Sequence, residues 1–419
     1  MTAGEVFLAP MGSAGDVHPY AGVGRELARR GHRVHLIANS YFEPVARRAG
    51  LNFVSAGPKE EYLAVIADPD LWEASASYRL MFEKMLQAMA TTYRLIAERF
   101  QRGRAVVVAP SANFGARVTQ EKLGVPLVSM NVEVNIFRSA EEWPGREVPR
   151  TWKAVTVPVR RAIMVAMDKW FFDPNLAPRI NAFRAELNLR SPVHYVMRNW
   201  LHSPDCVIGL FPEWFSGRYD DWPANLHLTG FPLFDDPDAR RMDEADEQFL
   251  HNGTPPIVFT FGSAMRAASG LFETAVEVCR RLDRRGVLLT EFADQIPPGL
   301  PETVRHITYA PFSTLLPKAA ALVHHGGVGT TAQGLRAGVP QLVTPMIFDQ
   351  PYNAVRLRRL GVGRSIPPAR FKPDEAAQEL GELLGSAEVA QRCREAARRF
   401  GDGADPVRQT CDLIEAAMA

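Results

Sequence analysis

Short apolar runs alternate with helix-length amphipathic segments along almost the whole chain. In the first half, the runs predicted as buried strands are 5–9, 33–38, 52–55, 105–109 and 126–130, and the predicted helices are 19–30, 42–49 and 116–123. Gly31, Gly50 and Gly124 follow these helices, where a left-handed residue commonly ends a helix. Strands that alternate with helices predict crossover units and a parallel sheet.

The second half repeats this alternation with a different sequence. Its predicted strands are 257–261, 287–290, 304–307, 320–324 and 341–344, and its predicted helices are 271–282, 329–337 and 350–360. Segment 230–238, between the halves, is rich in Pro and Asp, which is typical of an exposed linker. The sequence therefore predicts an α/β protein of two parallel-sheet domains joined near residue 232. Because open parallel sheets bind ligands at the carboxyl ends of their strands, we expect the ligand site in a cleft that both domains face.

Two long stretches, 76–101 and 152–173, are helical in pattern and rich in Met, Phe, Trp and Tyr. Three interpretations stay open for them: packing of a helical core, the wall of an apolar acceptor pocket, or a face that lies on a membrane surface. The residues on which the membrane interpretation rests are Trp152, Lys153, Arg160, Arg161, Lys169, Trp170 and Phe171.

Composition and charge exclude several classes of protein. Lys and Arg number 48 against 47 Asp and Glu, a net charge of +1, so bulk charge does not drive nucleic-acid binding. No apolar run reaches the roughly 18 residues that cross a bilayer, and residues 1–10 lack the basic leader of a signal peptide. The four cysteines are scattered without a CxxC pair, which is typical of a reduced chain. We expect a cytoplasmic protein.

The first candidate site follows the first predicted strand. The segment from Gly12 to His18 reads Gly-Ser-Ala-Gly-Asp-Val-His, and small residues between a strand and a helix let the backbone approach a ligand. Only Gly12 and Gly15 are present where a dinucleotide fold would carry three glycines, so a dehydrogenase is disfavoured. Asp16 and His18 supply two side chains able to transfer protons, although Asp16 by position also suits a helix N-cap.

The second candidate site follows the strand at 320–324. Residues 324–331 read His-His-Gly-Gly-Val-Gly-Thr-Thr and open a helix, so backbone N–H groups and threonine hydroxyls can hold an anion. No P-loop lysine is present, which predicts a diphosphate site without NTPase activity. Asp349 and Gln350 open the next helix, and Ser263 follows the first strand of this half.

Together these segments resemble family 1 glycosyltransferases of the GT-B fold. The carrying residues are Tyr309-Ala310-Pro311-Phe312, 324–331, 338–341 and 349–354, and the N-terminal 12–19 segment is similar to the bacterial branch that includes antibiotic and sterol glycosyltransferases and the rhamnosyltransferases of rhamnolipid synthesis. The resemblance covers nearly the whole chain. It implies an acceptor-binding domain over 1–232, a nucleotide-sugar-binding domain over 233–400 and, over 401–419, a C-terminal helix that crosses back to the first domain.

The resemblance also implies a role for individual residues. Tyr309 stands where a Trp stacks on the nucleobase. His325 and Thr330 fall at diphosphate contacts, with Ser263 on the opposite loop, and Asp349 and Gln350 fall where an acid–Gln pair holds the sugar hydroxyls. The remaining expected donor-binding residues are Gly15, Gly327, Gly329 and Gln333.

Three departures from the family pattern matter. Asp16 stands where many relatives place a catalytic His, and 108–111 offers no supporting carboxylate, which is consistent with Asp16 itself as the base. His18 assists, orients the acceptor, or does neither. Gln333 replaces a Glu that often binds the ribose of UDP-sugars, so a dTDP-sugar is a second candidate donor. Phe312 replaces a frequent Gln and weakens the expectation of a base-edge contact.

The implied activity is an inverting transfer of a hexose or deoxyhexose from a UDP- or dTDP-sugar to a hydroxyl of a lipophilic acceptor. The candidate acceptors are a hydroxy-fatty acyl chain, a polyketide, a flavonoid and a sterol. Because protein dipoles can offset the diphosphate charge, no metal or other cofactor is expected, and the Asp-Pro-Asp triplets at 68–70 and 236–238 are interpreted as loops. A nucleotide-sugar epimerase of the same fold and a non-catalytic nucleotide-sugar or lipid-binding protein are the alternatives.

Overall fold

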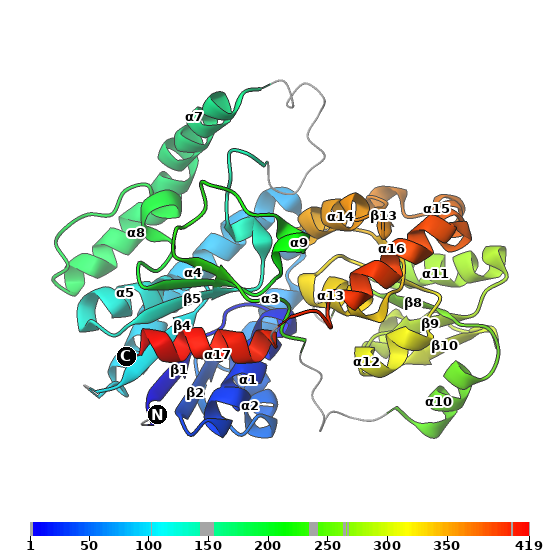
Figure 1. Cartoon of the computed structure of the whole chain (residues 1–419), viewed down its shortest axis with the longest axis horizontal. Coiled ribbons are helices and arrows are strands. Elements are labelled where there is room, and N and C mark those ends of the chain that lie inside the picture. The colour runs from blue at the N-terminus through cyan, green and yellow to red at the C-terminus, as the bar shows by residue number, and fades with distance from the viewer. Residues whose placement is uncertain are drawn as a thin grey trace. The chain divides into compact units, whose positions relative to one another are not determined.

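Two compact units make up the chain. In the computed structural model, residues 3–101, 103–142, 155–233, 242–262, 265, 268–403 and 405–418 are described. Contacts divide the chain into a first unit, Met1–Pro232 with Ala404–Ala419, and a second unit, Leu233–Gly403. Each unit is built around its own parallel sheet (Figure 1).

The first unit contains a seven-stranded parallel sheet in the order β3-β2-β1-β4-β5-β6-β7. Its strands are β1 (Glu5–Leu8), β2 (Arg33–Ala38), β3 (Asn52–Ser55), β4 (Ala105–Ala109), β5 (Leu127–Asn131), β6 (Cys206–Gly209) and β7 (Leu226–Leu228). Its helices are α1 (Ala14–Arg29), α2 (Glu43–Arg48), α3 (Lys59–Ala67), α4 (Ala74–Ala97), α5 (Phe114–Leu123), α7 (Val157–Met167), α8 (Asp173–Glu186), α9 (Glu213–Ser216) and α17 (Pro406–Ala417).

The second unit contains a six-stranded parallel sheet in the order β10-β9-β8-β11-β12-β13. Its strands are β8 (Ile257–Thr260), β9 (Gly286–Leu289), β10 (Val304–Ile307), β11 (Ala321–His324), β12 (Gln341–Val343) and β13 (Gly363–Ser365). Its helices are α10 (Glu244–His251), α11 (Ser269–Leu282), α12 (Phe312–Leu315), α13 (Val328–Ala337), α14 (Gln350–Arg359), α15 (Pro373–Gly385) and α16 (Ala387–Arg398).

The predicted α/β class and the parallel sheets are confirmed. Each strand predicted from an apolar run is present with bounds within one residue of the prediction. Three strands were not predicted: β6 has four residues, and β7 and β13 have three each, with polar His227 and Arg364 at their centres. Runs this short have too few apolar positions for their sequence pattern to distinguish a strand from a loop.

The predicted start of the first helix is wrong. Helix α1 begins at Ala14 rather than residue 19, and Pro19 lies inside it. Ser13 is the N-cap, and Ser13 with Asp16 forms a capping box that starts the helix before the proline. Asp16 is therefore the third helical residue and not the N-cap that its position suggested.

The aromatic- and Met-rich stretches form helices, of which α4 packs on α5 and α7 packs on the segment that follows it. From α4, Met85, Leu86 and Met89 enter a buried cluster with Leu176 of α8 and with Trp200. Helix α7 continues through a π-helical segment, η4 (Asp168–Phe172), directly into α8. The core-packing interpretation thus holds for α4, while Trp152 and Lys153 lie outside the described residues.

The C-terminal helix α17 packs on α1 of the first unit through a buried polar network. Glu415 accepts hydrogen bonds from Arg30 Nη1 at 2.6 Å and His32 Nε2 at 2.8 Å, and His32 Nδ1 accepts from the backbone N–H of Gly4. Burial acts to raise the pKa of Glu415, but the hydrogen bonds from His32 and Arg30 hold it below its ordinary value. The buried carboxylate is therefore charged and fully engaged.

All four cysteines are buried and unpaired with one another, in line with the expected reduced state. Burial raises the pKa of Cys206 to about 11 and that of Cys279, Cys393 and Cys411 to about 12, so none is a reactive thiolate near neutral pH. Among the helices in the described ranges, none has the length and apolar character that a membrane crossing requires.

The Glu415 network predicts how the C-terminal helix responds to mutation. Glu415→Gln should lower the free energy of unfolding at pH 7 by about 2–4 kcal/mol, because it removes the buried carboxylate that is paired with Arg30 and that accepts from His32. Since the pKa of Glu415 is lowered on folding, its stabilisation is complete above the unfolded value and is lost as the pH falls through the folded value. Urea denaturation at pH 7 and pH 4 measures both effects.

Asp412→Asn is the matched control. Its carboxylate also contacts Arg30, at 2.5 Å, but the side chain is 68% exposed. We expect a loss below about 1 kcal/mol. Equal losses in the two variants would contradict the assignment of the stabilisation to the buried carboxylate.

Candidate functional site

Asp16 lies at the turn that joins β1 to α1, at the carboxyl edge of the first sheet. Its Oδ2 accepts hydrogen bonds from the backbone N–H of Ser13 at 2.7 Å and from Ser13 Oγ at 3.2 Å. Because β1 is an inner strand, between β2 and β4, the turn is anchored on both sides. The carboxylate is held in one place rather than free to rotate.

Gly12 leaves the space that this carboxylate occupies. Its φ is +126°, a region that favours glycine. A Cβ at Gly12 would lie 2.3 Å from Asp16 Oδ2 and 2.6 Å from Asp16 Cγ. Both the backbone conformation and the close approach of Asp16 therefore require glycine here.

The surroundings of Asp16 change its acidity. Burial raises the pKa of Asp16 from 3.8 to about 6, and the hydrogen bonds from Ser13 offset part of that rise. Burial mainly raises the pKa of Tyr20 and of Tyr62; Asp16 adds a smaller effect at Tyr20, and Tyr41 and then Asp16 do so at Tyr62. An acid of pKa near 6 is a far better proton acceptor at neutral pH than an ordinary carboxylate.

The other N-terminal candidates lie close in sequence but differ in placement. His18 is half-buried on α1 two residues after Asp16, and residues two apart leave an α-helix on different sides. Gly15 is exposed at the second position of α1, in the first unit, whereas every other expected donor-binding residue belongs to the second.

A Ser–His contact that the sequence did not indicate lies beyond β4. Ser111 Oγ is 2.7 Å from His202 Nδ1, and the backbone N–H of Ser111 donates to Asn131 Oδ1. The His202 ring stacks on Phe137 with centroids 5.2 Å apart, and burial lowers the pKa of His202 to about 4. The two residues are 91 positions apart, so no local pattern could have paired them.

In the second unit, the expected diphosphate motif forms a glycine-lined turn between β11 and α13. Gly326 has a φ of +98°, and α13 begins at Val328 with Gly327 as its N-cap. A Cβ at Gly327 would lie 2.5 Å from His325 Nε2, and one at Gly262 would lie 2.9 Å from it. The His325 ring thus fits between two glycines from different loops.

Burial keeps both histidines of this motif neutral. It lowers the pKa of His325 to about 4 and that of His324, which is fully buried, to about 3. His324 Nδ1 accepts from the backbone N–H of Gly326. His325 Nδ1 is buried and has no hydrogen-bond partner among the described residues. We take this unpaired buried atom as a candidate contact for a ligand.

Asp349 and Gln350 lie beside this turn. Asp349 Oδ2 accepts from the backbone N–H of Val328 at 3.1 Å and from Asn353 Nδ2 at 2.7 Å. Asn353 Nδ2 also donates to the carbonyl of Gly326, so it ties the starts of α13 and α14 together. Gln350 Oε1 accepts from the backbone N–H groups of Met346 and Ile347.

Asn353 lies beside the candidate site, and sequence reasoning gave it no role of its own. Its position four residues after Asp349 in a predicted helix was the available signal, because such residues share a face. Its Oδ1 and the hydroxyl of Thr344 are also buried without a partner in the described part of the chain.

The other residues expected to bind the donor lie in α13, just beyond β10, or outside the described residues. Gly329 and Thr330 lie in the first turn of α13, and Gln333 is buried one turn later. Tyr309 is half-buried just beyond β10. Ser263 lies outside the described residues. Asp68 of the first Asp-Pro-Asp triplet accepts from the backbone N–H of Asp70 as a short turn, and the second triplet is not among the described residues.

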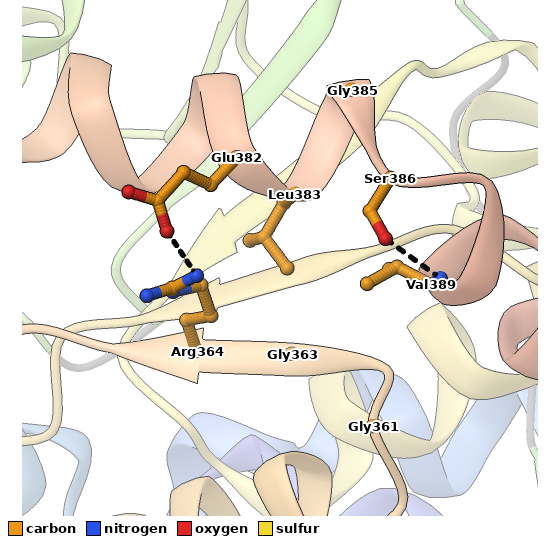
Figure 2. Close-up of a pocket in the computed structure, with 8 residues that line it drawn as sticks. All are labelled: Gly361, Gly363, Arg364, Glu382, Leu383, Gly385, Ser386 and Val389. Atoms are coloured by element: carbon orange, nitrogen blue, oxygen red, sulfur yellow. Dashed lines mark hydrogen bonds and ion pairs between the residues drawn. The ribbon is translucent and has the colours of Figure 1, made fainter.

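A pocket of about 480 Å³ in the second unit contains none of these residues. It is lined by the start of β13 and the α15–α16 junction (Figure 2). Arg364 in it is ion-paired with Glu379 and Glu382, and Ser386 caps α16 through the N–H of Val389. Its polar groups satisfy one another, so the glycine-lined turn is the stronger candidate.

The geometry at Gly12 gives a direct test. Gly12→Ala should destabilise the fold by about 2–4 kcal/mol, because it adds a left-handed strain and displaces the Asp16 carboxylate from Ser13. Gly31→Ala is the control: its φ is +93° but nothing lies within 4 Å of its Cβ, so it carries the strain alone, about 1–2 kcal/mol. Urea denaturation compares the two. If both substitutions lowered the free energy of unfolding equally, the close approach of Gly12 to Asp16 would contribute nothing to stability.

Two families of protein domain match the chain in order. Residues 6–139 match the glycosyltransferase family 28 N-terminal domain, and residues 281–407 match the erythromycin biosynthesis protein CIII-like C-terminal domain. The O-mycaminosyltylonolide 6-deoxyallosyltransferase of Streptomyces fradiae is 29% identical over 98% of this chain and 97% of its own. The sterol 3-beta-glucosyltransferase UGT80B1 of Arabidopsis thaliana is 26% identical over 94% of this chain and 65% of its own.

Solved structures of glycosyltransferases share the fold over the whole chain. The glycotransferase of kitacinnamycin aligns with a TM-score of 0.76 and 22% identity, and both chains are fully covered. The calicheamicin glycosyltransferase CalG4 aligns at 0.74 and 18%, over 100% of this chain and 99% of that one. VinC in complex with dTDP aligns at 0.70 and 18%, over 99% of each chain. With matching domains in this order and this fold, the chain belongs to the GT-B glycosyltransferases of the bacterial family 1 type.

Proposed function

We propose that this glycosyltransferase is inverting and transfers a hexose or deoxyhexose from a UDP- or dTDP-sugar to a hydroxyl of a lipophilic small molecule. The observation that carries the proposal is the Asp16 carboxylate, fixed by Ser13 against Gly12 with a pKa of about 6. Acceptor activation is assigned to the first unit and donor binding to the second.

Asp16 is the proposed general base. As the acceptor oxygen attacks the anomeric carbon, Asp16 takes the hydroxyl proton, the new glycosidic bond forms, and the bond from that carbon to the diphosphate oxygen breaks. Attack from the side opposite the leaving group inverts the anomeric configuration. The burial that raises the pKa of Asp16 limits the access of water to the carboxylate, which favours its action as a base at neutral pH.

The glycine-lined turn of the second unit is the proposed diphosphate site. The N–H groups at the start of α13, with Gly327, Gly329 and the Thr330 hydroxyl, would donate to the phosphate oxygens, and the helix dipole favours the charge that develops on the leaving group. His325 adds a neutral ring whose Nδ1 lacks a partner among the described residues. This donor set needs no metal in the proposal.

Asp349 and Gln350 are proposed to hold the sugar hydroxyls through their polar side-chain atoms. Asp349 Oδ2 is engaged by Val328 and Asn353, and Gln350 Oε1 by two backbone N–H groups. The proposal assigns the carboxylate of Asp349 as an acceptor and the amide of Gln350 as a donor to the sugar. One acceptor and one donor at adjacent positions suit a pair of neighbouring hydroxyls. Ser263 and Tyr309 keep their expected roles as diphosphate and nucleobase contacts.

The donor nucleotide is proposed to be dTDP or UDP, with Gln333 favouring the deoxyribose. Support comes from similar proteins: VinC and SsfS6 were solved with dTDP, and SpnG is a spinosyn rhamnosyltransferase. The relative from S. fradiae transfers a 6-deoxy sugar by its name. An epimerase, which needs no acceptor, and a non-catalytic binding protein, which needs no base at Asp16, are less well supported.

Substitution of Asp16 tests the base assignment. Asp16→Asn should lower kcat/KM about 10²–10⁴-fold in acceptor-dependent release of nucleoside diphosphate, measured with EDTA present, while nucleotide binding stays unchanged. Because the base works only when ionised, wild-type kcat/KM should rise with pH through about 6 and level off above it. His18→Gln is the control: if it removed the acidic limb and Asp16→Asn kept it, His18 would be the base. Activity lost to EDTA alone would contradict the metal-free donor site.

The donor assignment is tested by ligand-induced stabilisation. At 100 times its dissociation constant, a nucleotide should add about 2.7 kcal/mol of stability, seen as a raised Tm. We expect dTDP to stabilise the protein at least as well as UDP, with NAD inert as the negative control. Gln333→Glu should shift the preference towards UDP by up to about tenfold, the value of one hydrogen bond. No shift with either diphosphate would overturn the assignment of the turn at 325–330.

A further inference from the structure

Helix α7 and the π-helical segment that follows it present apolar side chains to solvent. None of the eleven residues of α7, all of which the structure describes, is buried. Val159 is 50% exposed, Trp170 is 73% exposed and Phe171 is 48% exposed. Helices rich in apolar residues normally bury one face, so a helix with this sequence and no buried residue marks an interaction surface.

The exposed charged side chains of this segment are all positive. Between residues 155 and 172, a stretch described without a gap, the one acid is Asp168, which is buried and paired with Arg138. Arg161 and Lys169 are exposed, and the Lys169 ammonium lies 5.8 Å from the centroid of the Trp170 ring. Arg160 is folded back onto the carbonyls of Val155 and Glu141.

The surface continues onto helix α4. Phe82 of α4 contacts Phe171 and Phe172, with ring centroids 6.4 and 6.0 Å apart. Tyr78, four residues earlier on the same face of α4, is 51% exposed. We call Tyr78, Val159, Arg161, Lys169, Trp170 and Phe171 the aromatic-basic surface.

Of the acids near the surface, Glu141 is exposed, whereas Asp173 accepts from the backbone N–H groups of Tyr195 and Val196. Glu83 of α4, next in sequence to Phe82, is ion-paired with Arg179 of α8. In the first unit, α7 projects beyond α8 and away from the strands (Figure 1). The surface therefore combines a protruding apolar ridge with an excess of positive charge.

We propose that the aromatic-basic surface docks the protein onto an anionic lipid bilayer. Trp170 and Phe171 would enter the interface between headgroups and acyl chains, where aromatic side chains are favoured. Arg161 and Lys169 would meet the negative headgroups, which attract cationic side chains close to the surface. A second copy of this chain in a symmetric contact would bring Arg161 and Lys169 against like charges, which disfavours it as the occupant.

Co-sedimentation of the full chain with vesicles tests the proposal. We expect binding to vesicles of phosphatidylglycerol and phosphatidylcholine, little binding to phosphatidylcholine alone, and release at high salt. Trp170→Ser with Phe171→Ser should weaken binding at least about tenfold. Arg161→Glu with Lys169→Glu should weaken it at least about 25-fold, because each cation lost is worth about fivefold.

Two further variants test whether lipid binding depends on this surface rather than on net charge alone. Arg394→Glu with Arg398→Glu makes the same change of net charge on α16 of the second unit and should bind as the wild type does. Trp170→Phe keeps an aromatic ring at the surface, so it should bind lipid but lose the blue shift in tryptophan emission that the wild type shows with vesicles.

Each contrary outcome overturns the proposal. Equal binding to both kinds of vesicle would exclude attraction to headgroup charge as the cause of binding. Unchanged binding by the Trp170→Ser, Phe171→Ser variant would exclude the aromatic-basic surface as the place where lipid binds. Light scattering adds the remaining test: a wild-type dimer that becomes monomeric in that variant would make a second copy the occupant. Folding of each variant is checked by its Tm, which should stay near that of the wild type because the changed side chains are exposed.

Discussion

Parallel strands must be covered on both faces, and this constraint organises each unit. A strand followed by a parallel neighbour needs a crossover, so each carboxyl edge collects turns that lead from a strand into a helix. β1 and β11 are inner strands of their sheets, and both lead into turns whose backbones carry glycines at positive φ, Gly12 and Gly326. The carboxylate in one unit and the histidine pair in the other are placed by the same topological rule.

The candidate site residues of the second unit also stabilise the fold. Asp349 and Asn353 join the starts of two helices, and Gln350 holds the loop before its own helix. In the proposed function, each uses part of its hydrogen-bonding capacity on the protein and part on the donor. Such bonds to the protein fix the orientation of a side chain in advance, which reduces the ordering needed when a ligand binds.

The strands and the glycine turns could be predicted because both leave local signals: buried apolar runs and small residues at fixed spacing. The start of α1 could not, because Pro19 suggested a boundary while the Ser13–Asp16 capping box set it. The raised pKa of Asp16 depends on burial by the surrounding fold, and the Ser111–His202 contact depends on a separation of 91 residues. Such effects arise only when distant segments meet, so local patterns do not contain them.

The path of the chain has a consequence for how the two units fold. The first unit is completed by α17, whose Thr410 hydroxyl lies 2.8 Å from that of Thr229, whereas the second unit is one continuous segment. The second unit can therefore fold from one stretch of chain, whereas the packing of α17 on α1 joins residues as far apart as Arg30 and Glu415, 385 positions along the chain. Until α17 packs, the surface of α1 that it covers stays exposed to solvent.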